Sequence, residues 1–403
     1  MTVWDDLVGQ DRVQAQLAAA ARDADALVTA DAAHASTDGM SKSTMTHAWL
    51  FTGPPGSGRS TAARAFAAAL QCVSPDRALG GVAGCGFCEG CHTALVGTHA
   101  DVEVVRTEGL SLGVKETREL VRRAQLSPAV GRWQIIVMED ADRLTEGAGN
   151  VLLKAVEEPA PRTVWLLCAP SLEDVLPTIR SRCRSLTLRT PPVDAVADLL
   201  VRRDGIDPGA AMSAARATQG HIGRARRLAT DERARARRAA VLKMPLRIDD
   251  IGGCLKSAQD LVDAATADAK EVAEGSDTKE TEDLKAALGA SAGGRMPRGT
   301  AGAMKELADR QKRRSTRTQR DSLDLALTDL TGFYRDVLAL QLRSRVAIAN
   351  EDVRDTLDRV ALNSSPERTL RRIEAISACR EALDRNVAPL LAVEAMAVSL
   401  RAG

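Results

Sequence analysis

Short apolar segments alternate with helix-forming segments between residues 47 and 190, and this alternation constrains the fold more than any other feature. The composition of buried strands recurs in five segments: 47–52 (HAWLFT), 101–105, 134–140, 163–169 and 185–190. Segments rich in good helix formers lie between them, at 60–72, 114–126 and 149–158. Such alternation predicts a parallel sheet covered by helices.

The regions around this core have different patterns. Residues 3–28 predict one short amphipathic helix, DRVQAQLAAAARDADAL, introduced by the turn-like LVGQ. The polar, non-periodic stretch 29–46 is interpreted as an exposed insertion. Pro191 and Pro192 end the alternation. Residues 265–320 pass from an acidic stretch through a Gly-rich one to a basic one. Because blocks of like charge are usually solvated, we expect a flexible linker with helical pieces there in preference to a DNA-binding stripe.

The C-terminal third predicts a helical core. An apolar stripe with alternating four- and three-residue steps is formed by Leu323, Leu327, Leu330, Tyr334 and Val337. Further helices are expected at 367–384 and 387–401. The fold class is therefore α/β followed by all-α. Three domains are expected: a parallel-sheet domain (1–190), a small helical domain (191–240) and a larger helical domain (241–403).

Composition limits the classes of function. The 55 basic and 54 acidic residues nearly cancel, so no overall field draws the chain to nucleic acid. No apolar run approaches the roughly 20 residues that span a bilayer, and the N-terminus lacks a signal pattern, so a cytoplasmic protein is expected. In that reducing compartment, clustered cysteines indicate a metal site in preference to disulfides.

Residues 53–60 (GPPGSGRS) fit a phosphate loop at every fixed position except the lysine. The loop follows a strand and opens a helix, where backbone N–H groups can surround a phosphate. An arginine fork is a poor substitute for a compact ammonium at such a tight site. The residues predicted to line this degenerate site are Gly53, Gly56, Gly58, Arg59 and Ser60.

A second nucleotide element is the apolar strand that ends in Glu139 and Asp140. Active motors place aspartate first, toward magnesium, and glutamate second, to orient water. Here the order is reversed, and the second carboxylate is one methylene short. Because positioning is most of what a protein contributes to phosphoryl transfer, we expect ATP and Mg²⁺ to bind weakly or not at all, with poor turnover.

A third motif, Ser181-Arg182-Cys183, lies just before the last strand, in LPTIRSRCRSL. With this motif the chain resembles the bacterial clamp-loader family of AAA+ proteins. The resemblance covers residues 1–230 well and the C-terminal domain loosely. The other segments that carry it are Val8-Gly9-Gln10, 150–159, 220–223 and 386–400.

The resemblance implies that Arg182 is an arginine finger acting in trans on the γ-phosphate held by an adjacent subunit. The alternative is an arginine in a local salt bridge. Motor subunits (gamma/tau) keep the loop lysine and a Gly-Ser-Leu-Arg motif, whereas this chain has Arg59 and, aligned on Gly220, Gly223. A retained trans finger with lost cis elements resembles the delta-prime branch. The delta branch is expected to lack the finger motif.

This likeness implies a DNA polymerase III subunit in a hetero-pentamer with gamma/tau and delta, loading a sliding clamp onto primed DNA. Residues 1–190 would be an AAA+ P-loop domain, 191–240 its helical lid and 241–403 a collar domain. The chain's own ATPase activity would be weak or absent. One alternative is an active ATPase motor of a clamp loader or helicase. Another is a zinc-stabilised adaptor without a nucleotide role.

Four cysteines have the spacing of a metal site: Cys72, Cys85, Cys88 and Cys91. Two-residue gaps form tight turns that bring thiolates together, and Cys72 at the end of the preceding helix supplies a fourth. Four thiolates leave no open position, which predicts a closed structural zinc site within 72–91. His92 is the weaker candidate, because four cysteines already complete a tetrahedron.

Overall fold

The computed structural model describes residues 2–32, 43–75, 83–288 and 300–403. The chain forms two compact units, one of residues 1–107 and 111–226, the other of residues 227–403 with 108–110. The boundary near residue 226 falls inside the expected lid, 191–240. The division into three domains with boundaries at 190 and 240 stays a prediction.

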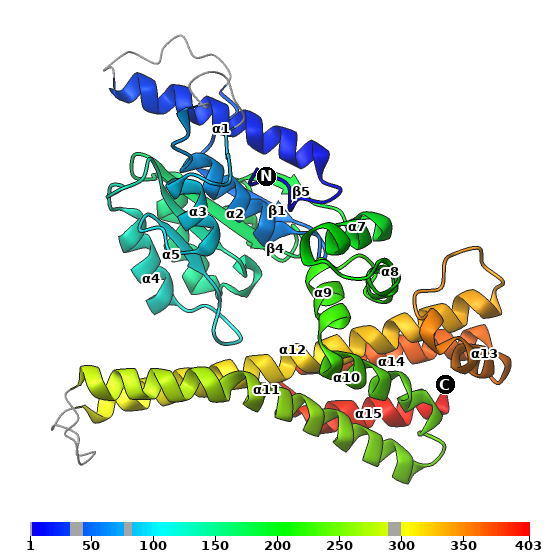
Figure 1. The fold of residues 1–403 in the computed structure, drawn as a ribbon. Helices are drawn as coiled ribbons and strands as arrows, with labels where there is room; N and C mark the ends of the chain where they lie inside the picture. Colours follow the sequence, from blue (N-terminus) through cyan, green and yellow to red (C-terminus); the bar gives the residue numbers. More distant parts are fainter. Residues whose placement is uncertain (1, 33–42, 76–82, 289–299) are drawn as a thin grey trace. The chain divides into compact units, whose positions relative to one another are not determined.

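The first unit is built on a five-stranded sheet in the order β2-β3-β4-β1-β5 (Figure 1). All four strand pairs are parallel, which confirms the predicted sheet. The strands lie where the sequence predicted them, within two or three residues: β1 (Ala48–Thr52), β2 (Val102–Val105), β3 (Gln134–Met138), β4 (Thr163–Ala169) and β5 (Arg184–Thr187).

Helices cover both faces of this sheet (Figure 1). On one face, α1 (Asp11–Ala32) and α2 (Arg59–Leu70) pack against Trp49 and Phe51 of β1. On the other, α4 (Val114–Ala124) and α5 (Glu146–Glu157) pack with Leu50. Because successive side chains of a strand point to opposite faces, β1 and β4 are buried at every residue and read as continuous apolar runs.

The N-terminal helix begins at Asp11, directly after the turn-like LVGQ, and ends later than the predicted residue 28. Thr2 donates its backbone N–H to Asp5 Oδ2 at 2.9 Å, and Gly9 has φ +68°, so residues 2–10 form turns before the helix. The helix continues to Ala32, inside the expected insertion 29–46. Residues 33–42 of that insertion lie outside the described residues. At its far end, Thr44 Oγ1 donates to Asp23 Oδ2 at 2.6 Å.

Five more helices belong to this unit or begin in it. They are α3 (Glu89–Val96), α6 (Pro177–Arg180), α7 (Val193–Asp204), α8 (Pro208–Ala217) and α9 (Ile222–Thr230). Two glycines allow close approaches at the end of the sheet domain. A Cβ on Gly9 would lie 2.8 Å from Pro192, and one on Gly220 would lie 2.4 Å from the Pro191 carbonyl oxygen.

The second unit is helical throughout its described elements. Its helices are α10 (Glu232–Leu242), α11 (Ile251–Ala287), α12 (Ala301–Gln341), α13 (Arg354–Leu362), α14 (Pro366–Asp384) and α15 (Pro389–Ala402). Every member of the predicted stripe, from Leu323 to Val337, is buried in one core on α12. Among all described helices, none has the length and apolarity needed to cross a bilayer.

The described part of the expected linker 265–320 is helical in α11 and α12, so its helical pieces are longer than expected. The reason is charge complementarity between the acidic end of α11 and the basic start of α12. Arg314 pairs with Glu280 at 2.8 Å and also with Asp277, and Gln311 Nε2 donates to the Asp277 carbonyl at 3.1 Å. The two charge blocks therefore neutralise each other between helices. The Gly-rich residues 289–299 lie outside the described residues.

The apolar stripe of α12 allows a test of the hydrophobic core of the second unit. Leu330 is fully buried, so Leu330→Ala should lower the free energy of unfolding by about 2–5 kcal/mol, measured by denaturant titration. Leu362 of the same unit is 87% exposed, and Leu362→Ala is the matched control, expected to leave stability nearly unchanged. Equal effects of the two substitutions would contradict the assignment of Leu330 to the core.

Candidate functional site

The phosphate-loop segment connects β1 to α2 at the carboxyl end of the sheet. Gly53, Gly56 and Gly58 have φ values of +152°, +86° and +90°, which other residues rarely adopt. Gly58 precedes α2 without a side-chain cap, so the first amides of that helix face the loop. Gln10 fixes the loop from outside, because its Nε2 donates to the Ser57 carbonyl at 3.2 Å and the Arg189 carbonyl at 2.6 Å.

Arg59, which stands at the lysine position, folds back onto the loop itself. Its Nη1 donates to the Gly53 carbonyl oxygen at 2.6 Å. Burial lowers the pKa of the Arg59 guanidinium, against the opposing charges of Asp142 and Asp140. Arg59, the one cationic side chain of residues 53–60, is thus held by the backbone of Gly53.

His221 packs against the same loop from the segment before α9. A Cβ on Gly56 would lie 2.5 Å from His221 Cγ and 2.7 Å from Cδ2, so the ring rests directly on this glycine. Its Nδ1 accepts the Arg224 N–H at 3.3 Å, as a cap at the start of the helix. Burial lowers the pKa of His221 to about 4, and the charges of Arg224 and Arg59 act in the same direction, so the ring is neutral at pH 7.

The acids after β3 are already paired. The Glu139 carboxylate accepts from Arg64 Nη2 at 2.7 Å and from Arg106 Nε at 2.5 Å. Asp140 Oδ2 accepts the Thr107 N–H at 3.1 Å. Arg64 lies on α2, so the structure does bring the acid pair beside the phosphate-loop helix. Arg64 and Arg106 were not predicted as site residues, because no spacing rule connects either arginine to Glu139.

The Ser-Arg-Cys segment follows α6 and leads into β5. Arg182 is about two-fifths exposed; it forms an ion pair with Glu157 of α5, and its Nη1 donates to the Thr178 carbonyl at 2.8 Å. Ser181 Oγ also donates to that carbonyl, at 3.0 Å. Burial raises the pKa of Cys183 to about 12, so it is a packed thiol rather than a reactive one. Glu157 lies in the segment 150–159, one of those that carry the resemblance, but its ion pair with Arg182 was not predicted.

The four predicted cysteines come together between α2 and α3. All four sulfur atoms lie within 4.8 Å of one another. Cys72 follows the end of α2, and Cys88 caps α3 by accepting the Cys91 N–H at 3.5 Å. A Cβ on Gly90 would lie 2.1 Å from the Gln71 carbonyl oxygen, so only glycine lets α3 approach the end of α2 this closely. His92 is exposed and is not among the clustered residues.

The cluster has the dimensions of a tetrahedral thiolate site. Zn–S bonds of about 2.3 Å place tetrahedral sulfurs about 3.8 Å apart. The Cys85–Cys91 and Cys72–Cys88 sulfur separations are 4.0 Å and 3.9 Å. The residues therefore fit a structural zinc ion, and the alternative of four unrelated thiols does not explain their convergence.

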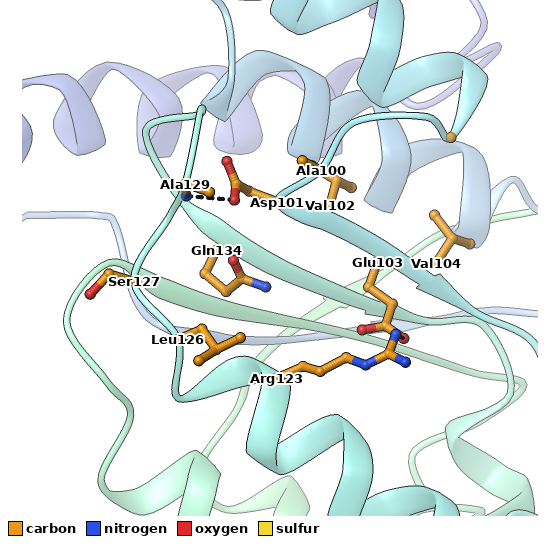
Figure 2. Close-up of a pocket in the computed structure, with 11 residues that line it drawn as sticks. Ala100, Asp101, Val102, Glu103, Val104, Arg123, Leu126, Ser127, Ala129 and Gln134 are labelled. Atoms are coloured by element: carbon orange, nitrogen blue, oxygen red, sulfur yellow. Dashed lines mark hydrogen bonds and ion pairs between the residues drawn. The ribbon is translucent and has the colours of Figure 1, made fainter.

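A separate hollow of about 470 Å³ lies beside β2, at the edge of the sheet (Figure 2). Arg123 and Glu103 pair across it at 2.8 Å. Asp101 fixes its rim by accepting the Ala129 N–H at 2.7 Å. No residue of the phosphate loop, the finger motif or the cysteine cluster lines this hollow, so it is distinct from the predicted nucleotide site.

Comparison with known proteins places these features in context. Residues 30–192 match the family model described as DNA polymerase III, delta subunit. The chain is 33% identical over 181 residues to DNA polymerase III subunit delta' of Escherichia coli, covering 44% of this chain and 53% of the relative. It is 29% identical over 205 residues to delta' of Bacillus subtilis, covering 51% and 60%. It thus spans just over half the length of these relatives.

Similarity extends to other proteins at smaller coverage or lower identity. The gamma/tau subunit of Mycobacterium bovis is 36% identical over 157 residues, which is 39% of this chain and 26% of that protein. A solved gamma subunit-related protein from Thermotoga maritima aligns with 88% of this chain and 93% of its own, at 14% identity and a TM-score of 0.39. The similarity lies in the N-terminal unit, where residues 30–192 match the family model. This part of the chain is similar to DNA polymerase III delta' subunits and also to gamma/tau subunits.

Proposed function

We propose that this chain is the delta' subunit of a clamp loader and supplies Arg182 to ATP bound by a neighbouring motor subunit. The observation that carries the proposal is a contrast between two arginines. Arg59 is turned inward onto the Gly53 carbonyl of its own phosphate loop. Arg182 lies partly exposed in the finger motif. A protein with this pair can act on a neighbour's nucleotide more readily than on its own.

The proposed assembly is a hetero-pentamer with gamma/tau motors and delta, which loads a sliding clamp onto primer-template DNA in the cytoplasm. The relatives that support it are DNA polymerase III subunits delta' and gamma/tau. The proposal assigns residues 1–190 to a P-loop domain, 191–240 to a lid and 241–403 to a collar that holds subunits together. In this assignment the phosphate loop does not serve as a motor's ATPase site, although it keeps Gly53, Gly56, Gly58 and Ser60.

The ion pair between Arg182 and Glu157 does not prevent this role. Both side chains are about two-fifths exposed, and such surface pairs contribute only about 0–1 kcal/mol. A phosphate oxygen can accept charge-assisted hydrogen bonds from the planar guanidinium, as the Glu157 carboxylate does. Arg182 can therefore leave Glu157 for the γ-phosphate, where its charge stabilises the transition state of hydrolysis.

Substitution of Arg182 tests the proposal in the reconstituted loader. Arg182→Ala should leave folding and assembly intact but depress ATP turnover, because one motor loses a group worth roughly 10³–10⁵ in rate at its site. Total turnover should fall only partially unless the sites fire in order. Arg182→Lys should not rescue it, since an ammonium lacks the planar fork. Steady-state hydrolysis by the whole loader is the measurement.

Two control variants separate the alternatives. If Arg182 only serves the local salt bridge, Glu157→Gln should depress loader turnover as much as Arg182→Ala; we expect it to have little effect. Arg59→Ala should also change turnover little, because the loop is not a motor site. A loader crippled by Arg59→Ala and normal with Arg182→Ala would mean that the subunit acts in cis, as an ATPase motor.

We also propose that Cys72, Cys85, Cys88 and Cys91 hold one structural zinc ion. Four sulfur ligands leave no coordination position for a substrate, so the ion would stabilise the fold without taking part in chemistry. The supporting observations are the sulfur separations and the tight packing of α3 on the end of α2. The ligands come from segments on both sides of residues 76–82, so the ion would tie these segments together.

Metal analysis tests this site. Protein purified without chelator should contain one zinc per chain, and Cys85→Ser or Cys88→Ser should release it and lower the melting temperature, because metal binding contributes to folding. Cys379, buried in the second unit, provides the control: Cys379→Ala should keep the full zinc content. Wild-type protein without zinc would contradict the proposal.

A further inference from the structure

We propose that His221 and Arg59 together close the phosphate loop, and that replacing both residues opens it to nucleotide. This inference rests on the proposed function in taking the loop as silent in the natural protein. It goes beyond that function in naming a second residue, outside the loop, that keeps nucleotide out.

His221 covers Gly56 sterically. The His221 ring lies so close to Gly56 that even a methyl group there would overlap Cγ at 2.5 Å, Cδ2 at 2.7 Å and Cβ at 2.8 Å. In a phosphate loop, the glycine backbone must be free for the close approach of phosphate oxygens. A ring that rests on Gly56 covers part of that surface. Reverting Arg59 alone would leave this cover in place.

The loop keeps groups that would hold a phosphate. Ser57 Oγ is buried in the loop and has no hydrogen-bond partner among the described residues. The amino-terminal end of α2 has no side-chain cap. The loop thus keeps donors suited to an anion, while the Arg59 fork is held on the Gly53 carbonyl at 2.6 Å. The anion-binding groups of the loop are therefore intact beneath Arg59 and His221, the two side chains that close it.

Binding and hydrolysis depend on different residues. Glu139 pairs with Arg64 and Arg106, and Asp140 accepts the Thr107 amide, and these contacts involve neither Arg59 nor His221. These acids are the groups expected to hold Mg²⁺ and orient water. Opening the loop should therefore give a protein that binds nucleotide but does not turn it over.

The test uses the isolated full-length chain and a fluorescent ATP analogue with Mg²⁺, titrated by polarisation. The variants are Arg59→Lys, His221→Ser and the double substitution. Serine removes the ring but still caps a helix start, so α9 should keep its first turn. We expect the double variant to bind at least about tenfold more tightly than wild type, and more tightly than the two single effects combined, because each residue blocks the loop alone. Turnover should stay at background.

A substitution at an exposed histidine checks that the change in affinity is specific to His221. His92→Ser replaces an exposed histidine on α3 and should leave affinity unchanged. Circular dichroism and melting temperature show whether each variant folds, and His221→Asn, which also caps helices, replaces serine if that variant does not. The inference is overturned if the folded double variant binds no more tightly than wild type, or if Arg59→Lys alone gives the whole gain. Neither result affects Arg182, whose test needs partner subunits and reads loader turnover.

Discussion

The pairing of β1 with a parallel neighbour on each side is the constraint on which the first unit depends. Leu50 of β1 pairs with Leu167 of β4 and with Ser185 of β5. Because all strands run in one direction, their carboxyl ends gather at one edge, where polar loops collect. The phosphate loop leaves β1 at this edge, and the Glu139 segment leaves β3. The Ser-Arg-Cys segment lies apart from both, because it directly precedes the amino end of β5.

The sheet was predictable because burial on both faces produces apolar runs that periodicity detects. The cysteine cluster was predictable as well, since thiol spacing reports tight turns. Side-chain partners across long sequence separations were not. Arg64 and Glu139 are 75 residues apart, and the contact of His221 with Gly56 depends on how the segment after β5 returns to the loop. Local sequence carries no signal for such contacts.

The α11–α12 pair shows why charge blocks mislead when they are examined singly. An acidic stretch and a basic stretch each suggest solvated chain, yet in an antiparallel pair they neutralise each other. Arg314 of α12 forms ion pairs with Asp277 and Glu280 of α11. Arg237 of α10 forms an ion pair with Asp268, which also lies on α11. The turn before α1, by contrast, has a local signal, because LVGQ contains Gly9, which adopts a φ of +68°.

The helix α2 has one end in the phosphate loop and the other in the cysteine cluster, since Arg59 opens it and Cys72 follows its last turn. Its 12 residues make a rod about 18 Å long. A rod anchored at its far end transmits displacement along its axis. If the cysteine cluster holds a zinc ion, as proposed, that ion would fix the far end of α2. The cysteine cluster and the phosphate loop would then share one helix as their support, although they share no atoms.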